Sequence, residues 1–214
     1  MDEDISAISA NTRNTKIINF FINNKKKIIS TLSIIILLIF SYFILVEIKT
    51  RNKINIADRY NSLKINFDSG KNKNLEKEMI DIVYAKDKTY SPLALYFLLD
   101  NNIINSKEKI NSLFDILINE TKVDKEIKNL IIYKKALYNS EFETENNLLK
   151  MLNPIINSES IWKSHALYLM AEYFLSKNEK QKSKEFFEKI LILENSNPQI
   201  KLEAQKRIQR DFSE

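Results

Sequence analysis

The sequence predicts an all-α protein in which one N-terminal membrane helix precedes a series of helical hairpins. Residues 28–46 form a run of 19 residues without a charge. Because a helix rises 1.5 Å per residue, this run is about 30 Å long, which matches the hydrocarbon core of a bilayer. Beyond it, apolar residues recur at helical spacing in short segments, and no segment keeps the period-two alternation of a strand.

We expect residues 1–24 to be a disordered cytoplasmic tail and residues 25–48 to be the transmembrane anchor. The tail is rich in Ser, Thr and Asn, a composition typical of disordered termini. Its apolar stretch at 17–22 also allows a short helix lying on the membrane surface. A cleaved signal peptide is the alternative to the anchor, but its apolar region usually spans only about 7–15 residues, and the run here is longer.

Basic residues on the two sides of the span indicate its orientation. Lys25, Lys26 and Lys27 precede it directly, whereas Lys49 and Arg51 begin a more dispersed basic stretch. Cytoplasmic flanks of membrane helices carry an excess of positive charge. We therefore expect a cytoplasmic N-terminus and, in a Gram-negative bacterium, a single-pass inner-membrane protein with a periplasmic C-terminal domain.

Residues 49–90 are expected to form a divergent helical stretch that continues from the anchor. Apolar residues recur there every three or four positions, as on one face of a helix, at Ile54, Ala57, Tyr60, Leu63 and Phe67. Ser69-Gly70, which contains the only glycine of the chain, is predicted to end this helix. A second helix fits residues 74–85.

Residues 91–214 are expected to form a domain of helical repeats. Ser91-Pro92 suits the N-cap and first position of a helix. Further amphipathic helices are predicted at 107–120, 124–139, 144–152, 160–176, 179–193 and 199–212. Turns that contain asparagine or proline separate them at short intervals. Such connections are typical of antiparallel helical hairpins in a bundle or a solenoid.

Small residues recur where the two helices of a hairpin would touch. Ala171 precedes Phe187 by 16 residues, and Ala136 precedes Leu152 by the same number. Ala136 and Ala171 are 35 residues apart, close to the period of a tetratricopeptide repeat (TPR). A weaker unit centres on Ala94. The last hairpin resembles a TPR, and this resemblance implies packing roles for Ala136, Leu167, Met170, Ala171, Phe174, Ser183 and Phe187.

The order of parts is similar to that of the YfgM-like family of ancillary Sec-translocon subunits from Proteobacteria. A short tail, one anchor, a divergent helical stretch, Trp162 before a clear hairpin, and a closing helix with Ala204 carry the resemblance. It implies a periplasmic TPR-like domain that associates with the Sec translocon, periplasmic chaperones or exported polypeptides. Related TPR-like proteins act instead in cell-envelope assembly or division, so a self-associating scaffold is the alternative function.

In TPR proteins, the first helix of each repeat lines the binding groove. The resemblance therefore implies a protein-binding groove at Tyr133, Leu137, His165, Tyr168 and Glu172. A half-exposed surface position is the alternative for His165, and burial under neighbouring helices is the alternative for Tyr133 and Leu137. Trp162 is expected to pack between two hairpins, and a role as an anchor for a partner is its alternative.

The composition argues against chemistry of the chain's own. Its 214 residues include one glycine, three prolines, one histidine and no cysteine, which disfavours phosphate-binding loops, thiolate nucleophiles and Cys-based zinc sites. The net charge of +5 comes from interspersed charges of both signs and is weak evidence for nucleic-acid binding. We expect no enzyme activity, no catalytic or cofactor-binding residue, no metal site, no nucleic acid and no small-molecule substrate.

Overall fold

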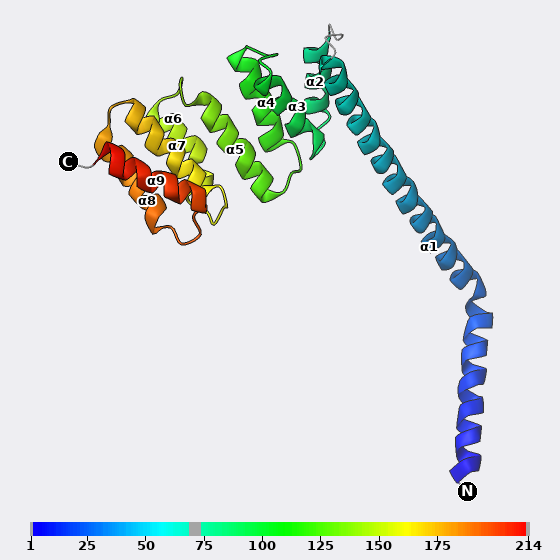
Figure 1. Ribbon diagram of the computed structural model, residues 1–214. Coiled ribbons are helices and arrows are strands. Elements are labelled where there is room, and N and C mark those ends of the chain that lie inside the picture. Colours follow the sequence, from blue (N-terminus) through cyan, green and yellow to red (C-terminus); the bar gives the residue numbers. More distant parts are fainter. Residues whose placement is uncertain (1, 69–73, 213–214) are drawn as a thin grey trace. The chain divides into compact units, whose positions relative to one another are not determined.

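The computed structural model describes residues 2–68 and 74–212, and within these ranges it is helical, with no strand (Figure 1). The predicted end of the first long helix at Ser69-Gly70 lies outside the described residues. The helices, in chain order, are α1 (Asp2–Asp68), α2 (Leu75–Tyr84), α3 (Tyr90–Asp100), α4 (Lys107–Asn119), α5 (Lys125–Asn139), α6 (Glu145–Ile156), α7 (Lys163–Ser176), α8 (Lys180–Ile192) and α9 (Pro198–Asp211).

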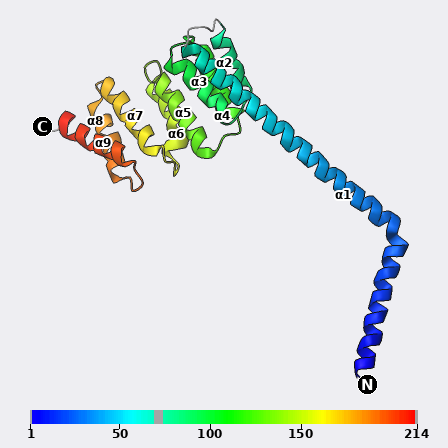
Figure 2. The same cartoon turned by 45° about the vertical axis from the view of Figure 1, so that its right-hand side comes forward.

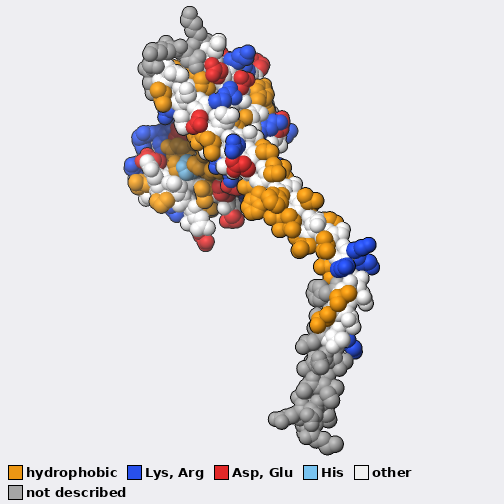
Figure 3. Space-filling view, turned by 90° about the vertical axis from the view of Figure 1, so that its right-hand side faces the viewer, with side chains coloured by type: hydrophobic (Ala, Val, Ile, Leu, Met, Phe, Trp, Pro, Cys, Tyr) orange, Lys and Arg blue, Asp and Glu red, His pale blue; other side chains and the backbone are white. Residues whose placement is uncertain are grey.

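Helix α1 contains a segment long and apolar enough to cross a membrane. Its candidate span lies within Ile22–Phe67, has a mean hydropathy of 2.7 in its most apolar window, and none of that window is buried against other helices. Figure 3 shows the exposed hydrophobic side chains along this part of α1, next to a cluster of basic ones. The predicted apolar run is thus a helix that is not part of a folded interior.

The first 24 residues differ from the expected disordered tail, because α1 already begins at Asp2. Neither proline nor glycine occurs between residues 2 and 68. Proline and glycine are the residues that most strongly interrupt a helix, so nothing in the local sequence separates the tail from the apolar run. Composition alone did not distinguish a polar tail from a helix that continues from an apolar segment.

The chain divides into two compact units, residues 1–55 and residues 56–214. The second unit includes the last turns of α1. There Leu63 is buried, and Tyr60 and Phe67 pack against aromatic residues of α3. The Tyr60 ring lies 5.7 Å from that of Tyr90, and the Phe67 ring lies 5.3 Å from that of Phe97. The end of α1 is therefore part of the first hydrophobic core.

Three hydrophobic cores follow one another along the second unit. The first joins α2, α3 and α4 with the end of α1, the second joins α5, α6 and α7, and the third joins α7, α8 and α9. The two ribbon views agree in showing α7, α8 and α9 side by side (Figures 1 and 2). All residues for which packing roles were expected are buried: Ala136, Leu167, Met170, Ala171, Phe174, Ser183 and Phe187.

Asparagine replaces glycine at the helix ends. Asn102 and Asn178 follow α3 and α7 with positive φ angles of 52° and 61°, a conformation that asparagine tolerates better than most residues. After α7, the N–H of Asn178 donates to the Leu175 carbonyl and the N–H of Glu179 to that of Phe174. This double hydrogen bond is the Schellman motif. Tight turns are thus possible in a chain with a single glycine.

Helix α6 extends beyond its predicted end. We expected a stop at Leu152 because Asn153-Pro154 follows, but α6 continues to Ile156 with Pro154 inside it. Proline removes one backbone donor and disturbs the preceding turn. The penalty is tolerated because Ile155 is fully buried in the second core.

Candidate peptide-binding face

Helices α3 and α5 form an apolar groove of about 400 Å³. Helix α3 and the turn before it contribute Lys88, Thr89, Pro92, Leu93 and Tyr96, and α5 with its N-cap contributes Asp124, Ile127 and Leu130. Leu93 and Ile127 keep 40% and 41% of their surface exposed. A groove with apolar walls and few polar groups is typical of a binding site.

Tyr96 carries a polar atom that the fold leaves without a partner. Its hydroxyl oxygen is buried, and it makes no hydrogen bond among the described residues. Burial raises the pKa of Tyr96 above its usual value, so the phenol is neutral. The Lys134 ammonium group lies 4.8 Å from the centre of the Tyr96 ring, a cation–π contact that places positive charge beside the groove.

An aromatic cluster lies between α5 and α7. The rings of Tyr133 and Trp162 stack at 6.1 Å with an angle of 19° between their planes. The His165 ring lies 5.9 Å from Tyr133 and 5.1 Å from Trp162. All three side chains are half-buried, so Trp162 packs between the helices and retains some exposed surface. The cluster provides flat apolar area of the kind that binds polypeptides.

The cluster is uncharged at neutral pH. Burial lowers the pKa of His165 below its model value of 6.5 and raises the pKa of Tyr133 above 10.0. The His165 Nδ1 atom is buried and has no hydrogen-bond partner among the described residues. A neutral imidazole is therefore favoured, because protonation would place a charge where water is excluded.

Helix α5 connects the groove to the cluster. Ile127, Leu130, Lys134 and Leu137 recur at intervals of three or four residues and so share one side of this helix, with Tyr133 beside them. Leu137 is 46% exposed. We call the combined surface the α3–α5–α7 face, defined by Leu93, Tyr96, Ile127, Leu130, Tyr133, Leu137, Trp162 and His165.

The expected groove residues fall into two groups. Tyr133, Leu137 and His165 belong to the α3–α5–α7 face, whereas Tyr168 and Glu172 contact the third core and α9. The Tyr168 ring packs 5.4 Å from that of Phe187. The Arg207 guanidinium of α9 donates to Glu172, through Nε to Oε1 at 2.6 Å and through Nη2 to Oε2. The carboxylate of Glu172 is therefore already occupied by an intramolecular ion pair.

The sequence prediction did not include the α3–α5 part of the face. Leu93, Tyr96, Ile127 and Leu130 were missed because the weak unit around Ala94 offered no reliable alignment with the later hairpins. A usable signal existed in the helical spacing of Ile127, Leu130 and Leu137. This spacing identifies a shared side of a helix, but not whether a neighbouring helix covers it.

One carboxylate fixes the start of α7 relative to α5. Glu126 Oε2 accepts hydrogen bonds from the Ser160 hydroxyl at 2.7 Å and from the Ile161 N–H at 3.2 Å. Glu126 lies in the first turn of α5, and Ser160 and Ile161 precede Trp162. These bonds hold the loop that presents Trp162 to Tyr133. Charge-assisted bonds of this kind are stronger than those between neutral groups.

No metal centre or known relative identifies the site. In the part of the chain that the structure describes, no group of three or more His, Cys, Asp or Glu side chains is arranged to hold a metal ion. Comparisons with protein-family models, curated proteins and solved structures find no match to this chain. The functional argument therefore depends on the geometry of the α3–α5–α7 face.

Proposed function

We propose that the protein is a membrane-anchored module for protein–protein interaction whose α3–α5–α7 face binds segments of other polypeptides. The observation that carries the proposal is this uncharged apolar and aromatic face, which extends over three helices. Apolar and aromatic side chains of an extended or helical peptide would bury surface there, and the unpartnered hydroxyl of Tyr96 offers a hydrogen bond to a peptide group. The mechanism is binding alone, without a chemical step.

Recurrent contacts support a TPR-like arrangement of the helices. Hydrogen bonds between side chains or backbone groups of different helices repeat at separations of 33–35 residues, in the pairs Glu76–Lys109, Glu126–Ser160, Ser164–Asn197 and Glu172–Arg207. One repeat period per contact is expected when equivalent helices of successive repeats lie next to each other. In this arrangement α3, α5 and α7 are the first helices of successive repeats.

Contact between small residues adds to this support. The Ser183 hydroxyl donates to the Ala171 carbonyl at 2.8 Å, and both residues are fully buried. Residues without bulky side chains let α7 and α8 approach closely at this point. The TPR pattern requires this at the crossing of its two helices.

The anchor would hold the binding face near the membrane. A tether raises the effective concentration of a nearby partner, to the mM range for short flexible links. With the resemblance to ancillary Sec-translocon subunits, we propose a periplasmic domain on the inner membrane that receives exported polypeptides or periplasmic chaperones beside the Sec translocon. Binding of emerging apolar segments is a task that an uncharged face suits.

Photo-crosslinking in intact cells tests this function. A photoreactive amino acid is placed at Leu137 or Leu93 on the face, and at Leu202 of α9 as a matched control that is also exposed. We expect adducts with exported polypeptides, chaperones or translocon subunits from the two face positions, and only weak adducts from Leu202. Equal adduct patterns at all three positions would contradict the proposal.

A charge on the face should abolish the adducts. Ile127→Glu places a carboxylate in the α3–α5 groove, and Leu202→Glu places one on α9. Because a buried charge without a partner is costly, we expect crosslinking from Leu137 to fall in the first variant and to stay unchanged in the second. Retained crosslinking in the Ile127→Glu protein would exclude the groove as part of the site.

A further inference from the structure

The C-terminal end of α8 presents an exposed apolar side chain beside two hollows. Ile192 is 81% exposed, the highest value for a large hydrophobic side chain among the described residues. Hollows of about 550 Å³ and 520 Å³ both include Ile192 and Lys189 in their linings. We call Ile192 together with these hollows the α8 end surface. It shares no residue with the α3–α5–α7 face.

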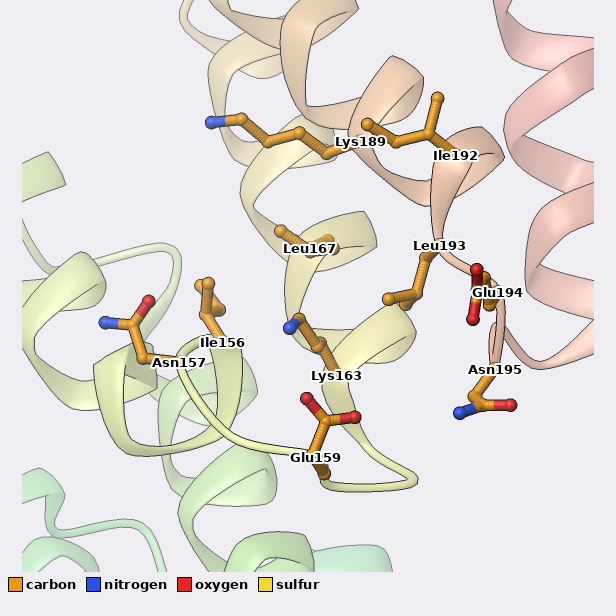
Figure 4. A pocket seen from close by; sticks show the side chains of 10 residues that line it. All are labelled: Ile156, Asn157, Glu159, Lys163, Leu167, Lys189, Ile192, Leu193, Glu194 and Asn195. Atoms are coloured by element: carbon orange, nitrogen blue, oxygen red, sulfur yellow. The ribbon is translucent and has the colours of Figure 1, made fainter.

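The larger hollow has an apolar base and a charged rim (Figure 4). Leu167 and Leu193 point toward its middle, and Ile156 of α6 lies on its other side. Leu167 is buried, whereas Ile192 is not. Charged and amide side chains surround the base: Asn157, Glu159, Lys163, Lys189, Glu194 and Asn195. The hollow therefore suits an apolar side chain that is accompanied by charges of both signs.

The charges of this surface disfavour a lipid headgroup layer as the occupant. The linings of the two hollows contain the basic residues Lys163 and Lys189, against the acidic residues Glu159, Glu185, Glu188 and Glu194. Anionic lipids attract surfaces with an excess of lysine and arginine, and here carboxylates outnumber ammonium groups. The membrane would repel this surface.

A second copy of the chain satisfies both requirements of the hollow. In a contact with two-fold symmetry, the same patch occurs on both partners, so a protruding residue of one copy can enter the hollow of the other, and the reverse. Ile192 supplies the protruding apolar group. Lysines of each copy would face glutamates of the other, since both signs occur on the rim.

We propose that the α8 end surface is a homodimer contact in which Ile192 of each copy enters the hollow formed by Ile156, Leu167 and Leu193 of the other copy. Confinement of both copies to one membrane raises their local concentration, a contribution that rests on the proposed membrane anchor. The contact leaves the α3–α5–α7 face open, so the dimer would present two copies of that face.

Site-specific crosslinking tests the contact in the full-length protein. The chain has no cysteine, so introduced cysteines are the only thiols. Chains with Ile192→Cys are mixed with chains carrying Asn157→Cys in lipid vesicles and treated with a short bis-maleimide. We expect covalent dimers at roughly ten times the yield of a control mixture of Leu202→Cys with Asn157→Cys, because only the first pair lies across the contact.

A charge variant gives an independent measure. Ile192→Glu adds a carboxylate to the centre of the contact, where desolvated apolar groups dominate binding. We expect the dissociation constant of the full-length dimer in mild detergent to rise roughly tenfold or more, as measured by sedimentation equilibrium. Leu202→Glu should leave it unchanged. Trp162 fluorescence checks that each variant remains folded.

Several results would overturn this proposal. One is a crosslinking yield equal to that of the control, which would also follow if the anchors alone held two copies together. Another is shielding of Ile192→Cys from a water-soluble maleimide in vesicles without any dimer, which would indicate lipid as the occupant. A third is crosslinking of Ile192→Cys only to a different protein. Unchanged photo-crosslinking from Leu137 in the Ile192→Glu protein would show that the proposed peptide binding is separate.

Discussion

The two ends of the second unit are closed by different interactions. At its N-terminal end, Leu63 is buried and Tyr60 and Phe67 pack on the aromatic rings of α3. At its C-terminal end, α9 buries Ala204 and binds Glu172 of α7 through Arg207. The first closure consists of apolar burial, whereas the second combines a smaller apolar contact with an ion pair. The two ends should therefore respond differently to truncation, salt and pH.

Truncation of the apolar closure should have the largest effect. Leu63→Ala removes a buried side chain, and such Leu→Ala changes cost about 2–5 kcal/mol. We expect a loss near the lower value, about 2 kcal/mol, because the site is at one end of the unit. Hydrogen exchange of the full-length protein would show faster exchange in α2 and α3. Equal protection in the variant would mean that α1 does not stabilise the first core.

Loss of the ion pair should have a smaller effect that depends on salt. The Arg207 and Glu172 side chains are 20% and 33% exposed, so the pair is only partly screened. A double-mutant cycle with Arg207→Ala and Glu172→Ala should give a coupling free energy of about 1 kcal/mol, decreasing as ionic strength rises. Urea unfolding of the full-length protein provides the measurement.

The pair Lys206–Glu203 is the matched control for this cycle. It lies on the same helix with side chains 59% and 43% exposed, and pairs of this kind contribute about 0.3–0.5 kcal/mol. If both pairs gave the same coupling, the closure of α9 would not depend on Arg207.

Between the two closed ends, His165 should make stability depend on pH. Burial lowers its pKa in the folded protein below the unfolded value near 6.5. The unfolded state therefore binds the proton more tightly, and stability is present above pH 6.5 and falls as the pH decreases toward the folded pKa. His165→Phe should remove this part of the pH dependence, as followed by unfolding with Trp162 fluorescence. An unchanged slope in the variant would assign the effect to carboxylates.

The smallest effect on stability is expected on the open face between the two ends. Leu137 is 46% exposed, so Leu137→Ala removes little buried surface and should change the free energy of unfolding by less than about 0.5 kcal/mol. Thermal unfolding of the full-length protein measures this change. A loss above about 1.5 kcal/mol, more typical of a buried leucine, would show that Leu137 is a core residue and not part of a binding face.

Sequence patterns located helices better than contacts. Ser106, Thr144 and Asn197 accept hydrogen bonds at the starts of α4, α6 and α9, and side chains of these types are local signals for a helix start. Boundaries failed where tertiary packing outweighed a local signal, as at Pro154. The disordered tail was expected from composition, but no breaker separates it from the apolar run of α1.

For the candidate site, the sequence identified the side of a helix but not its neighbour. Tyr133, His165, Tyr168 and Glu172 are equivalent by spacing, yet the first two remain on the α3–α5–α7 face and the last two contact the third core and α9. The difference arises because Phe187 and Arg207 are supplied by α8 and α9. Residues 19 and 35 positions away along the chain leave no periodic trace beside Tyr168 and Glu172.

The sequence by itself determined the apolar span of α1, the all-helical character of the described chain and the small residues at the helix crossings, because these depend on local hydropathy, backbone preference and side-chain size. Only the tertiary structure decided that the end of α1 belongs to the first core, that Arg207 occupies Glu172, and that Leu93 and Ile127 share a groove. These outcomes depend on which helices pack side by side, and packing is set by the combined burial of many distant residues.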